Sequence, residues 1–67
     1  MTTKYIGTNS YRYRYFKSPL GFTKFLLDVF TNPRYINMAE YNLPNEITEE
    51  QIAEFAKREI RYIESMA

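Results

Sequence analysis

The sequence predicts an α+β fold: a small single domain over residues 1–67 in the order β-β-α-β-α, with two helices packed on one face of an antiparallel sheet. Three observations predict it. Residues 11–17 alternate like a strand, residues 19–31 combine a proline start with a broad apolar face, and residues 48–51 form a helix-capping sequence. The chain has room for one core, because chains of this size bury only about 60% of their unfolded surface.

The first predicted element is a hairpin over about residues 4–17. Residues 4–6 are short and β-prone, residues 7–10 are turn formers, and residues 11–17 alternate in character. A period of two divides the second strand into two rows, which are Tyr11, Tyr13 and Tyr15 against Arg12, Arg14 and Phe16. We expect the tyrosine row to pack under the helices as core and the other row to face outward.

A helix is predicted over about residues 19–31. Ser18 suits the N-cap and Pro19 the first helical position, and the residue before Pro33 is disfavoured in helical conformation, which ends the pattern. At 100° per residue the apolar side chains gather on one broad face, so we expect this helix to be mostly buried. Residues 34–41 are predicted either as a third strand, which we favour for the first half, or as an irregular crossing.

The last predicted helix runs over about residues 48–66 and begins with the capping box Thr48-Glu49-Glu50-Gln51. Glu59 falls on its apolar face, where a carboxylate is costly unless it is paired. We therefore predict a structural ion pair between Glu59 and an arginine of the first half, Arg12, Arg14 or Arg34. The alternative is that a partner covers this part of the helix.

Charge is distributed unevenly along the chain although the net charge is only +1. Residues 1–35 carry six basic side chains and one acidic one, a net charge of +5, whereas residues 36–67 carry three basic and seven acidic side chains, a net charge of −4. Two arrangements stay open: the halves neutralise each other in the fold, or they form separate surfaces of opposite sign.

Composition argues against several function classes. The chain has no His and no Cys, the side chains best suited to proton transfer near neutral pH and to nucleophilic attack, so we expect no enzyme, no catalytic residues, no metal site and no cofactor. No apolar run approaches the roughly 20 residues that cross a bilayer. No apolar run follows Met1 as in a signal peptide, so we expect a cytoplasmic, intracellular protein.

The Tyr/Arg strand is the distinctive feature of the sequence. Its plainest interpretation is core tyrosines beside solvated arginines, but Tyr and Arg are also enriched in protein interfaces and in single-stranded nucleic-acid sites. The sequence favours a non-catalytic protein-binding module, a class typical of small regulators and of virus-encoded inhibitors. The predicted partner-binding residues are Arg12, Arg14, Phe16, Lys17, Tyr35, Glu50 and Glu54.

Two other functions are also compatible with the sequence. One is a nucleic-acid-binding protein that uses Lys4, Arg12, Arg14 and Lys17, although the acidic second half weakens affinity for a polyanion. The other is an accessory subunit that needs a larger complex for stability. The partner is not identified by the sequence, and homo-oligomerisation stays open.

Overall fold

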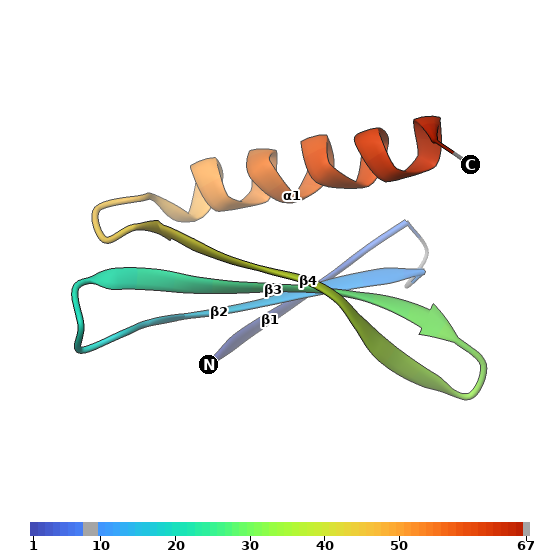
Figure 1. Ribbon diagram of the computed structural model, residues 1–67, viewed down its shortest axis with the longest axis horizontal. Helices are drawn as coiled ribbons and strands as arrows, with labels where there is room; N and C mark the ends of the chain where they lie inside the picture. The colour runs from blue at the N-terminus through green and yellow to red at the C-terminus, as the bar shows by residue number, and fades with distance from the viewer. Residues whose placement is uncertain (8–9, 67) are drawn as a thin grey trace.

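Over the residues that the structure describes, the protein is a four-stranded antiparallel sheet followed by one helix, in the order β-β-β-β-α. The computed structural model describes residues 1–7 and 10–66. The strands lie in the sheet in chain order, and the helix runs along one face of the twisted sheet (Figure 1). Their bounds are β1 Thr2–Ile6, β2 Tyr11–Lys17, β3 Phe22–Thr31, β4 Arg34–Pro44 and α1 Glu49–Ser65.

The hairpin of β1 and β2 forms as the sequence predicts, with Lys4 opposite Tyr13. Thr8 and Asn9 of its expected turn lie outside the described residues. At the ends of that turn the Ser10 N–H donates to the Gly7 carbonyl at 3.0 Å, and Gly7 adopts a φ of +64°. Glycine has no Cβ to oppose this left-handed conformation, so it closes the turn at little cost.

The predicted helix at residues 19–31 is wrong, and so is the fold with two helices. Residues 22–31 form β3, a central strand that pairs with both β2 and β4. β3 carries apolar residues on both of its faces, since Phe25 and Leu27 are buried in the core and Leu26 between them is half-buried on the other face. Such a nearly continuous apolar run also fills a broad helical face. The apolar pattern alone therefore did not distinguish the two.

The supposed helix start is a tight turn between β2 and β3. The Gly21 N–H donates to the Ser18 carbonyl at 3.2 Å, and the Leu20 N–H donates to Ser18 Oγ at 3.1 Å. Ser at the first position, Pro at the second and Gly at the fourth also suit a type I turn. Ser18 and Pro19 thus fit both interpretations, and pairing of the flanking strands decides between them.

The segment from residue 34 is a strand over a longer stretch than predicted. β4 follows a two-residue turn at Asn32–Pro33, whose peptide bond is cis, and it continues to Pro44. Its pairing with β3 shifts register between Leu27 and Asp28, which leaves Met38 as the extra residue of a β-bulge. Beyond the bulge the pairing continues to the end of β4.

The core lies between the sheet and α1. Buried side chains from β2, β3 and β4 face buried side chains from the helix, namely Tyr13, Tyr15, Phe25, Leu27 and Leu43 against Ile52, Ala56 and Ile60. Two of the three tyrosines expected in the core are thus buried, and Tyr11 is partly buried against it. Among residues 1–7 and 10–66, one amphipathic helix covers one face of the sheet, and no helix lies over the other face (Figure 1).

The helix begins as its sequence predicts. The Gln51 N–H donates to Thr48 Oγ1 at 3.1 Å, and the Thr48 N–H donates to Gln51 Oε1 at 3.0 Å, which completes the capping box. These two bonds satisfy backbone and side-chain groups that a helix start otherwise leaves to water.

Candidate functional site

The face of the sheet opposite α1, called here the open face, carries the row of β2 that was expected to point outward. Since Tyr13 and Tyr15 are buried under the helix, strand alternation places Arg12, Arg14 and Phe16 on the other side. The register adds Tyr5 and Thr3 from β1 opposite the two arginines. The open face is therefore the face of the sheet that carries the arginine row of β2.

Asp28 is fully buried on this face although no helix covers it. Its Oδ2 accepts hydrogen bonds from Arg12 Nε at 2.7 Å and Arg14 Nε at 2.8 Å. Its Oδ1 accepts from Arg14 Nη2 at 3.2 Å and from Asn37 Nδ2 at 3.1 Å. A carboxylate has about four acceptor positions, so this group is fully satisfied.

The β-bulge helps to build this cluster. It places Asn37 opposite Asp28 in the register, whereas Ala39 stands opposite Leu27. Bulges re-aim side chains in this way because two residues of one strand face one residue of its neighbour. The Asn37 amide thereby becomes the fourth donor to the carboxylate.

The electrostatics of the cluster follow from burial and hydrogen bonding. Burial alone raises the pKa of Asp28, but the hydrogen bonds from Arg12, Arg14 and Asn37 outweigh it, and the net shift of the pKa is downward. The hydrogen bond to Asp28 is also the main cause of the raised pKa of Arg12. Asp28 is therefore ionised at neutral pH, and the two arginines with Asp28 carry a net charge of +1.

An aromatic cluster of Tyr5, Phe30 and Tyr35 adjoins the arginines. The Tyr35 ring centroid lies 5.9 Å from that of Tyr5 and 5.2 Å from that of Phe30. Arg12 Cζ lies 4.5 Å from the Tyr35 ring centroid, within cation–π distance. The structure thus brings Tyr35 together with Arg12, two of the residues that the sequence singled out.

Large apolar side chains remain accessible around the cluster. The exposed fractions are 54% for Tyr5, 42% for Phe30 and 38% for Phe16. Farther along the same face Lys24 Nζ lies 3.7 Å from Glu40 Oε2. The open face therefore combines exposed rings with a fixed pair of guanidinium groups and one weak surface ion pair.

Lys17 lies apart from this arrangement. Its side chain donates to the backbone carbonyl oxygens of Asn45 and Ile47, in the loop that precedes α1. The structure therefore places Lys17 at the junction of β2 with the helix start rather than beside the arginines.

Glu59 has a hydrogen-bond partner other than the arginines named from the sequence. Glu59 Oε1 accepts a hydrogen bond from the Tyr41 hydroxyl at 2.6 Å, and this bond is the main cause of the raised pKa of Tyr41. Arg12 and Arg14 lie on the far side of the sheet from the helix that carries Glu59. The Tyr41 hydroxyl is thus the hydrogen-bond donor to Glu59, where the sequence led us to expect an arginine.

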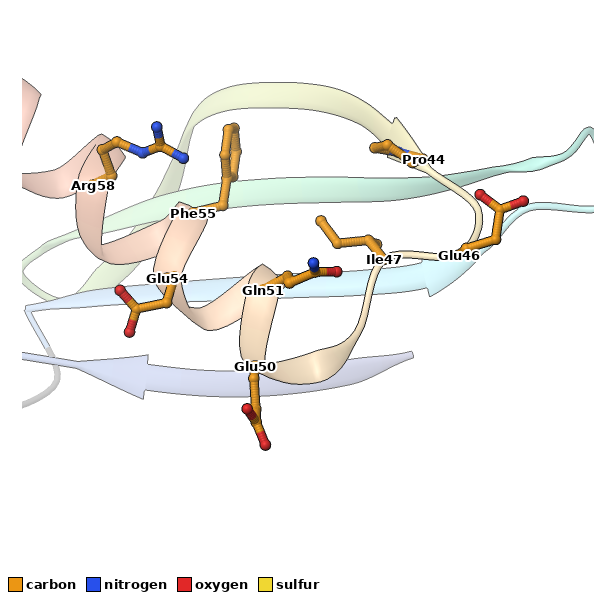
Figure 2. A pocket seen from close by; sticks show the side chains of 8 residues that line it. All are labelled: Pro44, Glu46, Ile47, Glu50, Gln51, Glu54, Phe55 and Arg58. Carbon is orange, nitrogen blue, oxygen red and sulfur yellow. The ribbon is translucent and has the colours of Figure 1, made fainter.

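Glu50 and Glu54 lie at a second location, beside a groove between the end of β4 and the first turns of α1. The groove has a volume of about 730 Å³ and is lined by Pro44, Glu46, Ile47, Glu50, Gln51, Glu54, Phe55 and Arg58. In Figure 2 the Glu50 and Glu54 side chains point away from Ile47 and Phe55. Their carboxylates therefore do not converge on one point in the groove.

Sequence reasoning missed Asp28, Asn37, Tyr5 and Phe30 as members of the site. One signal for Asp28 was present, because it is the only acidic residue among the first 35 and stands within an apolar run. Within residues 1–7 and 10–66, no group of three or more His, Cys, Asp or Glu side chains is placed to hold a metal ion.

Comparisons with known proteins found no relative of this chain. No protein-family model matches the chain, and neither a curated protein nor a solved structure matches it. In the described part of the chain, no helix has the length and apolar character needed to cross a membrane.

Proposed function

We propose that this chain is a non-catalytic protein-binding module, a small regulator or inhibitor that engages another protein through its open face. One observation carries the proposal: Tyr5, Phe16 and Phe30 are exposed on the same face of the sheet as the arginine pair that Asp28 holds in place. Aromatic residues and Arg are the types most enriched at interface hot spots, where rigid side chains lose little entropy on binding.

The rival proposal, a nucleic-acid-binding protein, has less support. Tyr13 and Tyr15 are buried under α1, so they are not available to stack on bases. The charge of Asp28 offsets one of the two charges of Arg12 and Arg14, and Glu40 offsets that of Lys24 on the same face. Affinity for a polyanion rises with each uncompensated cation, and here little positive charge remains.

The cytoplasm stays our expectation for where the protein acts, on the sequence grounds given above.

Affinity capture from an extract of the source cells tests the proposal. The wild-type chain is compared with Phe16→Glu/Phe30→Glu, which places two charges on the open face, and with the control Leu20→Glu/Tyr62→Glu, which places two charges at exposed apolar sites in the β2–β3 turn and on α1. We expect the open-face variant to lose the captured protein and the control to retain it. Circular dichroism checks that all three chains fold.

Retention of every captured protein by the open-face variant would remove this surface from the proposal. Anisotropy of labelled single-stranded DNA at two salt concentrations tests the rival, since steeply salt-dependent micromolar binding favours nucleic acid. An isolated chain that is unfolded at ordinary temperature and is rescued by a captured protein would favour the accessory-subunit alternative.

A further inference from the structure

The arginine pair of the open face has more hydrogen-bond donors than its internal acceptor uses. Each guanidinium group carries five N–H groups. Asp28 accepts one bond from Arg12 and two from Arg14, and its remaining position accepts from Asn37. The carboxylate is saturated, and the Tyr5 side chain takes a further hydrogen bond of Arg12. The guanidinium N–H groups that neither side chain engages need acceptors elsewhere.

These donors reach the surface and are held in place. The side chains of Arg12 and Arg14 are 27% and 25% exposed, whereas that of Asp28 is 1% exposed. The shared carboxylate fixes both guanidinium groups from below, and the Tyr35 ring lies against the group of Arg12. Because little side-chain freedom remains to be lost, an anion that binds here meets preorganised donors.

From this geometry we infer that Arg12 and Arg14 form a receptor for a carboxylate side chain, an Asp or Glu that a protein partner inserts between apolar residues. The inference rests on the proposed function and specifies the chemistry of the partner. The net charge of +1 on the two arginines with Asp28 is complementary to one carboxylate. A planar guanidinium group also matches the two oxygens of a carboxylate.

The surroundings favour a protein carboxylate over a phosphate chain. Tyr5 and Phe30 present apolar ring surface beside the arginines, which suits apolar neighbours of an acidic residue. Glu40 offsets the charge of Lys24 on the same face, so this face offers little net positive charge for the successive phosphates of a polyanion. Asp28 acts as a positioning residue, because it holds the arginines and makes no contact with the inserted carboxylate.

A titration of the wild-type chain tests this inference. The arginine Nε–H resonances of ¹⁵N-labelled protein are followed by NMR while the peptide acetyl-Phe-Glu-Leu-amide is added, and again with acetyl-Phe-Gln-Leu-amide. We expect saturable shifts of Arg12 and Arg14 with the Glu peptide. We expect about tenfold weaker binding of the Gln peptide, since hydrogen bonds to charged groups are the stronger ones. Arg58 and Arg61, exposed on α1, are internal controls that should not shift.

A variant and two further titrations complete the test. Arg14→Lys keeps the charge but loses the fork of donors, and we expect it to abolish the preference for Glu over Gln. Equal binding of the two peptides by the wild-type chain, or equal shifts of Arg58 and Arg61, would overturn the inference. The inference would also be overturned if oligothymidylate shifted both arginines at a lower concentration than the Glu peptide does, because that result favours a nucleic-acid partner. Shifts that appear when the chain alone is concentrated would assign the face to a second copy.

The two proposals fail in different ways. If open-face variants lose a captured protein but the wild-type chain does not distinguish the Glu peptide from the Gln peptide, the protein-binding function stands and the carboxylate receptor is wrong. If the Glu peptide binds selectively but no captured protein depends on the open face, the receptor chemistry stands and the proposed function is wrong.

Discussion

Arg14 binds both carboxylate oxygens of Asp28, at 2.8 Å and 3.2 Å, from a diagonal position on the neighbouring strand. In the register Arg14 stands opposite Leu26, and Arg12 is the residue opposite Asp28. One carboxylate thus joins two positions of β2 to the central strand. This contact stabilises the sheet on the side that α1 does not cover, and it orders the arginines of the open face.

Replacing Asp28 by Asn is expected to destabilise the fold. The change removes a buried charge and leaves two adjacent guanidinium groups without a counter-charge. Breaking a buried ion pair costs about 3–5 kcal/mol, and because both arginines are about a quarter exposed we expect a loss nearer to 2 kcal/mol. Urea denaturation measures it. Glu40→Gln on the same face is the control, and a similar loss in both variants would contradict the special role of Asp28.

Acid is expected to remove the contribution of Asp28 to stability. The pKa of Asp28 in the folded chain lies below its ordinary value of 3.8, so the unfolded chain takes up the proton first as the pH falls. Its stabilising contribution is therefore complete above the unfolded pKa and is lost as the pH falls through the folded pKa.

Thermal unfolding of the wild-type chain and of Asp28→Asn, followed from neutral pH into acid, measures this loss. The difference in free energy of unfolding between the two chains should be largest near neutrality and should narrow below pH 3.8. Glu40→Gln, which replaces an exposed carboxylate on the same face, is measured alongside as the control. A gap between wild type and Asp28→Asn that stays constant into acid would show that the carboxylate is not the group responsible.

The elements predicted correctly are those whose sequence pattern is compatible with only one kind of secondary structure. The capping box at Thr48 fits only the start of a helix. The period of two in residues 11–17 correctly separated the tyrosines from the arginines. Residues 19–31 do not form the predicted helix, and two signals were ambiguous: Ser18-Pro19 suits a turn as well as a helix start, and the apolar residues of β3 do not alternate with polar ones. Pairing with β2 and β4, which is non-local, determined the outcome.

The same error hid part of the site. Asp28 on a helix would lie on a polar strip facing solvent, whereas on β3 it lies opposite Arg12. Once β3 is in place, its position and the bulge at Met38 bring Asp28 and Asn37 together. Tyr5 and Phe30 join the site through register alone. Residue types identified half of the cluster, and the topology supplied the rest.

The capping box offers a direct test of the helix start. Thr48→Ala removes the acceptor of the Gln51 N–H and is expected to lower stability by about 1 kcal/mol, the usual value of an N-cap side chain. Thr48→Ser keeps a hydroxyl oxygen and should retain most of the stability. Thermal unfolding by circular dichroism measures both. Equal melting temperatures for the Ala and Ser variants would contradict a capping role for the hydroxyl.

Thr23 in the middle of the sheet is expected to be a site where a substitution stabilises the fold. Its side chain is fully buried on the helix side of β3, and its Oγ1 has no hydrogen-bond partner among the described residues. A buried polar group without a partner costs about 1–3 kcal/mol, and Val has nearly the same shape without the hydroxyl. Val also suits a central strand.

Thr23→Val should therefore raise the free energy of unfolding by about 1 kcal/mol, which for a domain of this size raises the melting temperature by about 4–8 °C. Thr3→Val, at an exposed position of the edge strand β1, is the matched control and should change little. The arginine cluster on the opposite face should be unaffected, so the Arg12 and Arg14 Nε–H resonances should keep their positions. A lower melting temperature for Thr23→Val would indicate that the hydroxyl binds an acceptor in solution.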